Sequence, residues 1–124
     1  MNVVLWIAAI LLALAFLAAG SMKLRRSKEQ IRESGMAWVE SFSPGTIKLI
    51  GAAEVLGAGG LILPPALGIA PVLAPLAATG LAVIMVGAIV THARLGERQQ
   101  VVVNLVLLIL AVFVAIERFG SYAF

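Results

Sequence analysis

The sequence contains no cysteine and only one histidine, and just 12% of its 124 residues are charged. The absence of cysteine excludes disulfides, thiol catalysis and thiolate metal sites, so cysteine usage says nothing about the redox compartment. One histidine cannot supply both axial ligands of a bis-histidine haem within the chain. A zinc site would need more ligands than His92 and Glu54 provide, so no metal is expected. No glycine-rich stretch has phosphate-binding spacing. The sequence therefore favours a protein that is not an enzyme on its own.

What the chain has in abundance is apolar residues, which make up 62% of the sequence and fall in long blocks. A helix needs about 20 mostly apolar residues to cross the roughly 30 Å hydrocarbon core of a bilayer. Four such helices with their connections use the whole chain. We therefore expect an all-α fold, a transmembrane four-helix bundle that forms a single domain over residues 1–124. The expected spans cover about residues 3–24, 46–63, 72–93 and 101–116.

Several residues indicate where these helices begin and end. Ser43 and Pro44 have the pattern of a helix start, with serine as N-cap and proline at the first helical position. Pro64 and Pro65 are expected to stop the second span, because proline cannot donate the next backbone hydrogen bond. Gly96 suits the turn between the last two spans. The first block lacks a preceding basic segment, so we expect a retained span rather than a cleaved signal peptide.

The basic residues predict the orientation of the bundle. Eight of the nine lie around the first and third connections, and only Arg118 lies on the other side. The eight are Lys23, Arg25, Arg26, Lys28, Arg32, Lys48, Arg94 and Arg98. Cytoplasmic loops of membrane proteins carry the excess of Lys and Arg, so both termini are expected on the non-cytoplasmic side. We expect a multi-pass protein of the inner or plasma membrane, with the lipid bilayer rather than nucleic acid as its partner.

The polar stretch between the first two spans is expected to form a short amphipathic helix at the cytoplasmic interface. Ser27 and Gln30 have the spacing of a capping box. The apolar side chains that share one helical face are Ile31, Trp38 and Phe42. Tryptophan is common at headgroup depth, which fits a helix lying in the plane of the interface. Gly35 weakens the helix, and an irregular basic loop remains the alternative.

Four polar residues, one in each span, need an explanation: Lys23, Glu54, His92 and Asn104. A charged group deep in the bilayer costs on the order of 3 kcal/mol even on lenient insertion scales. Side chains lean toward the N-terminus of their own helix, so these four lean toward a common level in the cytoplasmic half. Lys23 is within reach of Glu54. We therefore predict a shared polar cluster.

Each member of this cluster also has a purely structural explanation. Lys23 could snorkel to the interface, and Glu54 could be a structural ion-pair partner. His92 could face headgroups at its helix end, and Asn104 could join helices by a hydrogen bond. Whether the cluster binds a ligand or only holds the helices together stays open at this point. Four glycines are expected to permit close helix packing: Gly51, Gly57, Gly80 and Gly87.

The same residues carry a resemblance to a family. The stretch from Phe16 to Leu24 resembles the end of the first helix in DoxX-like membrane proteins, where a small-residue segment precedes Lys-Leu. The stretch from Gly51 to Gly57 looks like their second-helix motif, with a glutamate among small residues. His92 and Asn104 fit the same pattern. The resemblance covers nearly the whole chain and implies a four-helix membrane bundle.

The resemblance and the cluster together define three functional hypotheses. The first is an accessory or subunit of a membrane redox system, in which the polar cluster binds a quinone-like or lipid ligand and Glu54 or His92 handles protons. The resemblance implies this reading, because some relatives belong to quinone oxidoreductases. The second is a non-enzymatic assembly factor or scaffold with a structural cluster. A small transporter is a third, and it would have to form a homo-oligomer because four helices are few for alternating access.

Overall fold

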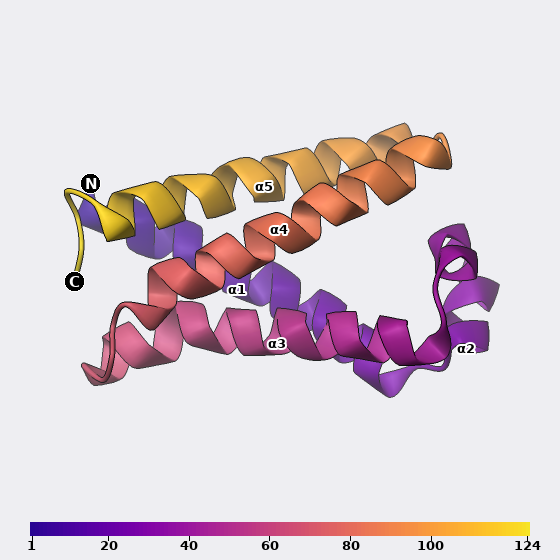
Figure 1. Cartoon of the computed structure of the whole chain (residues 1–124), viewed down its shortest axis with the longest axis horizontal. Helices are drawn as coiled ribbons and strands as arrows, with labels where there is room; N and C mark the ends of the chain where they lie inside the picture. The colour runs from indigo at the N-terminus through magenta and orange to yellow at the C-terminus, as the bar shows by residue number, and fades with distance from the viewer.

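The computed structural model describes all 124 residues and is entirely helical (Figure 1). It contains five α-helices and one 3₁₀ helix, η1. In chain order they are α1 (Asn2–Arg25), α2 (Lys28–Glu33), η1 (Ala37–Ser41), α3 (Pro44–Leu67), α4 (Leu73–Arg94) and α5 (Arg98–Phe119). Four of them, α1, α3, α4 and α5, are long and apolar enough to cross a membrane. The all-helical class and the four apolar spans predicted from the sequence are therefore confirmed.

The long helices are apolar on their outer as well as their inner faces. The buried core is small-residue-rich and includes Leu12, Phe16, Ala78 and Leu81. Large aliphatic side chains such as Leu56, which is 75% exposed, point outward. In water this outer surface would be unfavourable, whereas lipid tails solvate it as well as they solvate any leucine. The distribution of apolar side chains is thus that of a bilayer-embedded bundle.

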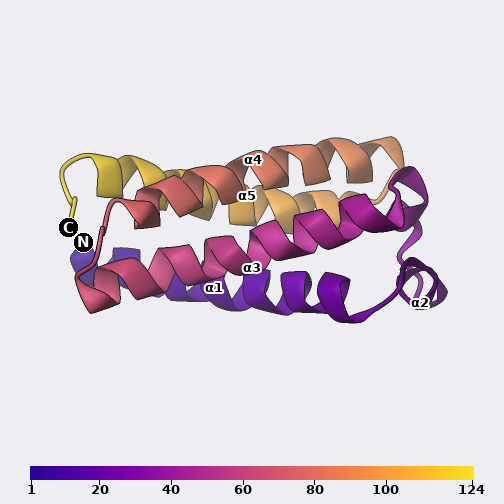
Figure 2. The ribbon, with the colours of Figure 1, turned by 60° about the horizontal axis from the view of Figure 1, so that its bottom comes forward.

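The long helices are arranged as two pairs. α1 packs most extensively on α3, and α4 on α5, while α3–α4 and α1–α5 contacts close the bundle. Figure 1 shows the two pairs diverging toward the end that carries α2 and η1, and Figure 2 shows both termini together at the opposite end. The α4–α5 turn lies at the same end as α2. The eight basic residues around the first and third connections thus belong to one end of the molecule.

The start of α3 follows the predicted pattern, but its end does not. The Ser43 hydroxyl accepts a hydrogen bond from the Thr46 N–H, and Pro44 occupies the first turn. The expectation that the second span stops at Pro64 and Pro65 was wrong, because α3 continues to Leu67. The fixed φ of proline is itself helical, and near a helix end the ring removes only a few backbone bonds. Gly68, with φ of 68°, ends the helix in the left-handed conformation instead.

The connection between α1 and α3 contains two short helices rather than the single expected one. Ser27 and Gln30 form the predicted capping box at the start of α2. Gly35, with φ of 98°, then breaks the helix before η1. Ile31 and Val39, from the two short helices, are fully buried against Ile47 of α3. This small second core fixes the connection onto the end of the bundle.

Glycines bring α1 and α3 close together. A Cβ added to Gly20 would lie 2.6 Å from the Gly51 carbonyl oxygen, and one added to Gly51 would lie 2.8 Å from the Lys23 Cβ. Gly57 is similarly close to a leucine of α4. The packing role expected for Gly80 and Gly87 was wrong, because nothing lies within 4 Å of a Cβ at either position. Only the glycines that face a neighbouring helix allow closer packing.

The end of the bundle that carries the termini is closed by a buried arginine. Arg118 of α5 is only 5% exposed, and its Nη1 donates to Asn2 Oδ1 at 2.7 Å and to the Tyr122 carbonyl oxygen at 2.8 Å. Its guanidinium carbon lies 3.9 Å from the centroid of the Phe124 ring. From the sequence, Arg118 was notable only as the one basic residue outside the first and third connections. The arginine joins the first turn of α1 to the C-terminal segment.

Candidate functional site

A cavity of about 620 Å³ lies between the two helix pairs, toward the end that carries α2 and η1. All four long helices contribute to it, and the α2–α3 connection contributes Gly35, Met36, Trp38 and Phe42. Thirteen of its 22 lining residues are hydrophobic, so the cavity is mostly apolar with a few polar groups. Its lining includes all four residues singled out in the sequence: Lys23, Glu54, His92 and Asn104. The common level that the helix directions indicated is thus a common cavity.

The shortest polar contact in the cavity joins α1 to α3. Lys23 Nζ donates to Glu54 Oε1 at 2.6 Å. The Glu54 side chain is 2% exposed and that of Lys23 is 12% exposed. The Lys23 ammonium also lies 5.5 Å from the centroid of the Trp38 ring, within the range of a cation–π contact. The ammonium therefore lies between a carboxylate and an indole, with N–H donors beyond the one used on Glu54.

Asn104 of α5 is the buried polar group of the cavity that the protein leaves unpaired. It is 9% exposed, and its Nδ2 is buried without any hydrogen-bond partner. Leaving a buried donor unsatisfied costs about 1–3 kcal/mol. This Nδ2 therefore does not form the interhelical hydrogen bond that was one explanation for Asn104. An amide in this state can donate to an acceptor that enters the cavity.

His92 is paired, but with a residue that the sequence reasoning did not single out. Its Nδ1 lies 2.9 Å from Glu97 Oε1, across the tight turn between α4 and α5. Both residues line the cavity. The five-residue spacing around Gly96 was the available signal, because a tight turn returns the chain on itself. The structure thus divides the predicted cluster into a Lys23–Glu54 pair, a His92–Glu97 pair and an unpaired Asn104.

Two aromatic residues of the connection, which the sequence did not assign to the polar cluster, form another part of the cavity wall. Trp38, which was expected at headgroup depth, lines the cavity together with Phe42. The two rings meet edge to face, with centroids 6.0 Å apart. A flat ligand ring could pack against such side chains. No group of three His, Asp or Glu side chains is close enough to hold a metal ion.

The family comparison agrees with the motifs. A family model described as the DoxX-like family matches residues 7–114, which is nearly the whole chain and includes every polar residue of the cavity named above. No curated protein matches the chain, and neither does any solved structure.

Proposed function

We propose that this chain, which belongs to the DoxX-like family, binds an amphipathic ligand of the quinone class in the cavity between its helix pairs. The protein is a multi-pass membrane protein with four apolar helices. In this role it acts as an accessory or subunit of a membrane redox system, and a partner protein supplies the electrons. The ligand chemistry follows from the cavity, and the redox association follows from the family resemblance.

The observation that carries the proposal is the unpaired Asn104 Nδ2 in a mostly apolar cavity. Ligand sites are typically apolar clefts of about 300–1,000 Å³ with a few polar groups that orient the ligand. A quinone head has two carbonyl acceptors and a flat ring. Asn104 can donate to one carbonyl, the Lys23 ammonium can donate to an oxygen, and Trp38 can pack on the ring. A buried donor that lacks a protein partner regains a hydrogen bond when such a ligand binds.

Two ionisable groups of the cavity can exchange a proton with the head of a bound ligand. Glu54 is held by Lys23, and His92 is held by Glu97. A carboxylate and an imidazole are the side chains most often used for proton transfer. Glu97 belongs to the α4–α5 turn, so the His92 pair lies nearer the end of the bundle than Glu54 does.

We also infer the orientation of the protein in its membrane. Eight basic residues lie at the α2 end, and only Arg118 lies at the other end. This excess of positive charge supports a cytoplasmic location for the α2 end. Both termini then lie outside. α2 and η1 lie at the cytoplasmic interface, and the cavity lies in the cytoplasmic half of the bilayer. The inner or plasma membrane is the location that this charge distribution fits.

Tryptophan fluorescence provides the direct test, since quinones quench indole emission on contact. The chain has two tryptophans: Trp38 lines the cavity, and Trp6 lies at the far end, 5.6 Å from the Phe124 ring centroid. A short-chain benzoquinone added to the purified protein should quench Trp6→Phe, whose only tryptophan is Trp38, with saturation. It should quench Trp38→Phe only weakly and without saturation. Equal quenching of both variants would overturn the proposal.

The role of Asn104 is tested in the Trp6→Phe background. Asn104→Leu removes the unpaired donor, and quinone affinity should fall about tenfold, as expected for a lost hydrogen bond of about 1.4 kcal/mol. Thr79→Val is the matched control, because it removes a polar group that bonds its own helix at Pro75, away from the cavity lining. An affinity unchanged by Asn104→Leu would exclude this amide as a ligand contact. A phospholipid that competes with the quinone would point to a lipid ligand instead.

A scaffold or assembly factor is the second candidate, and the Lys23–Glu54 contact favours it. That ion pair joins α1 to α3 beside the Gly20–Gly51 contact and would pin one helix arrangement. In this reading Glu54→Gln lowers thermal stability and the yield of any larger complex, and no quinone binds. A homo-oligomeric transporter has no comparable observation in its favour.

A further inference from the structure

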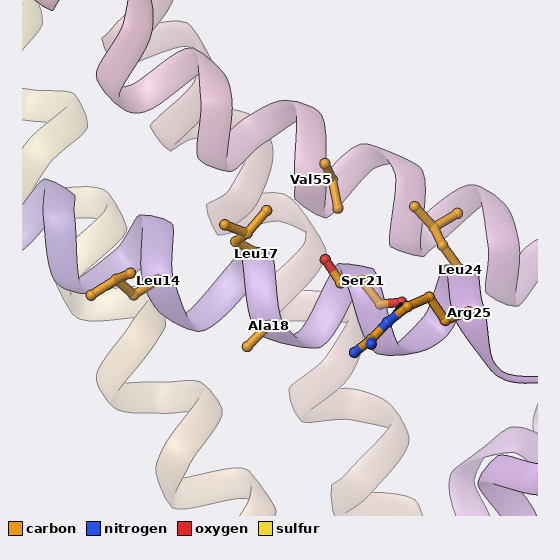
Figure 3. A pocket seen from close by; sticks show the side chains of 7 residues that line it. All are labelled: Leu14, Leu17, Ala18, Ser21, Leu24, Arg25 and Val55. Atoms are coloured by element: carbon orange, nitrogen blue, oxygen red, sulfur yellow. Dashed lines mark hydrogen bonds between the residues drawn. The ribbon is translucent and has the colours of Figure 1, made fainter.

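A second concave site lies on the outside of the bundle, away from the cavity between the helix pairs. It is a groove along the second half of α1, beside α3 (Figure 3). Its volume is about 650 Å³, and five of its seven lining residues are hydrophobic. They are Leu14, Leu17, Ala18, Ser21, Leu24, Arg25 and Val55. Figure 3 shows Val55 approaching from α3, while the other side chains belong to α1.

We propose that this outer groove is a binding site for one anionic phospholipid of the surrounding bilayer. An acyl chain lies along the leucines, and the phosphate of the headgroup lies at Arg25. This inference does not depend on the quinone proposal. The groove has an apolar stretch lined by leucines and a basic end at Arg25, which match the acyl chain and the headgroup of a lipid.

The apolar part of the groove has the dimensions of an acyl chain. From Leu14 to Leu24 the helix rises about 15 Å, which is half of the bilayer's hydrocarbon thickness. Leu14 is 60% exposed and Leu17 is 46% exposed, so the bundle leaves them uncovered. Ala18, one turn after Leu14, also lines the groove, and its small side chain leaves room for a lipid tail. In a bilayer such a surface is filled by a lipid tail from the leaflet nearest the α2 end.

The polar end has an uncompensated charge. The ion pairs of the chain are Lys23–Glu54, Arg32–Glu40 and His92–Glu97, so Arg25 has no carboxylate partner. Its only hydrogen bond runs from Nε to the Ser21 carbonyl oxygen at 3.4 Å, which directs the side chain back along α1 (Figure 3). Both Nη groups remain free. A guanidinium with a free edge matches a phosphate better than an ammonium does.

Neighbouring groups make this end attractive to an anion. Arg26 follows directly and also lacks a carboxylate partner. The negative end of the α1 dipole is covered, because Lys48 Nζ donates to the carbonyl oxygens of Lys23, Leu24 and Arg26 at 2.7–2.9 Å. The last-turn carbonyls therefore do not repel a phosphate at this site. The anionic lipids of a cytoplasmic leaflet are the chemical partner that this end fits.

Lipid retention by the purified protein tests the site. The full chain is equilibrated in mild detergent with an equal mixture of phosphatidylglycerol and phosphatidylcholine that carry the same acyl chains. Bound lipid is then counted by native mass spectrometry. The wild type should retain phosphatidylglycerol about fivefold over phosphatidylcholine, the factor that corresponds to about 1 kcal/mol per basic side chain near an anionic headgroup.

Three variants separate this site from general electrostatics. Arg25→Gln should reduce the preference to near one, and Arg25→Lys should keep part of it. Arg94→Gln removes an exposed, unpaired charge from the same end of the bundle but outside the groove, so the preference should persist. Ala18→Leu fills the groove and should lower retention of both lipids without changing the helical circular dichroism spectrum.

Several outcomes would overturn the proposal. The first is a wild type without lipid preference. The second is a loss with Arg94→Gln as large as that with Arg25→Gln, because the whole basic end would then be responsible. The third is a protein dimer that Ala18→Leu dissociates, because a second copy of the chain would then occupy the groove.

Discussion

Lys23 of α1 and Glu54 of α3 meet at 2.6 Å beside the point where Gly20 and Gly51 bring the two helix backbones together. The Glu54 side chain is only 2% exposed, so its carboxylate is almost entirely removed from solvent. Its stability in an apolar bundle therefore depends on the ammonium. The Lys23 side chain is 12% exposed and has a longer aliphatic stem, so its ammonium can reach solvent more easily if the ion pair is broken.

This asymmetry predicts unequal effects of removing either partner. Lys23→Met leaves Glu54 buried without its partner and should lower the free energy of unfolding by about 3 kcal/mol. Glu54→Gln should cost less, because the freed ammonium can reorient toward the interface. The measurement is unfolding by titration with a denaturing detergent in mixed micelles.

The double substitution Lys23→Met with Glu54→Leu provides the control. Replacing both members of a buried pair with apolar groups is often neutral, so stability should return to near the wild-type value. If the double variant were as unstable as Lys23→Met alone, the loss would reflect packing around Lys23 rather than an unpaired charge.

The approach of α1 to α3 predicts a second pair of results. Gly20→Ala places a methyl group 2.6 Å from the Gly51 carbonyl oxygen, so the helices must separate. Overpacking of this kind costs about 1–3 kcal/mol, which thermal unfolding in detergent would detect. Gly80→Ala is the matched control, because nothing lies within 4 Å of the new methyl group. It should be neutral or slightly stabilising. Equal loss in both variants would contradict the close approach.

Arg118 predicts a local effect at the other end of the bundle. Arg118→Gln removes the hydrogen bond to Asn2 and the stacking on Phe124. A hydrogen bond from a charged group contributes about 1.5–3 kcal/mol. Hydrogen exchange should therefore accelerate in the first turn of α1 and in the last residues of the chain. Exchange around the cavity should stay unchanged, and acceleration throughout the bundle would show a global role instead.

The absence of cysteine makes the orientation easy to test. Ser121→Cys places a thiol next to the C-terminal segment, and Gln99→Cys places one near the α4–α5 turn. In intact cells a membrane-impermeant maleimide should label Ser121→Cys. Gln99→Cys should react only after the membrane is permeabilised. The reverse pattern would show that the termini face the cytoplasm.

Much of the architecture could be predicted from residue order because its causes are local. A run of apolar residues long enough to cross a bilayer becomes a helix wherever it occurs, since backbone groups in lipid must bond within the segment. Ser43 and Ser27 cap the helices that follow them for equally local reasons. The end of α3 could not be predicted in this way. Pro64 and Pro65 permit a helix that Gly68 ends.

The site was partly predictable. Helix direction was enough to place Lys23, Glu54, His92 and Asn104 at one level, because each Cβ leans toward the start of its own helix. Direction does not specify rotation about the helix axis. Packing decides that, and it brought Lys23 onto Glu54 while it left Asn104 without a partner.

The sequence by itself thus determined that this protein is a set of four apolar helices with one polar residue in each. Only the tertiary structure decided what those residues face. The two helix pairs diverge at the α2 end, so the four line a cavity rather than a closed core. Trp38 also faces that cavity, because Ile31 and Val39 bury against Ile47 and hold the connection against the end of the bundle. Contacts between segments distant in sequence set these positions, and no local pattern encodes them.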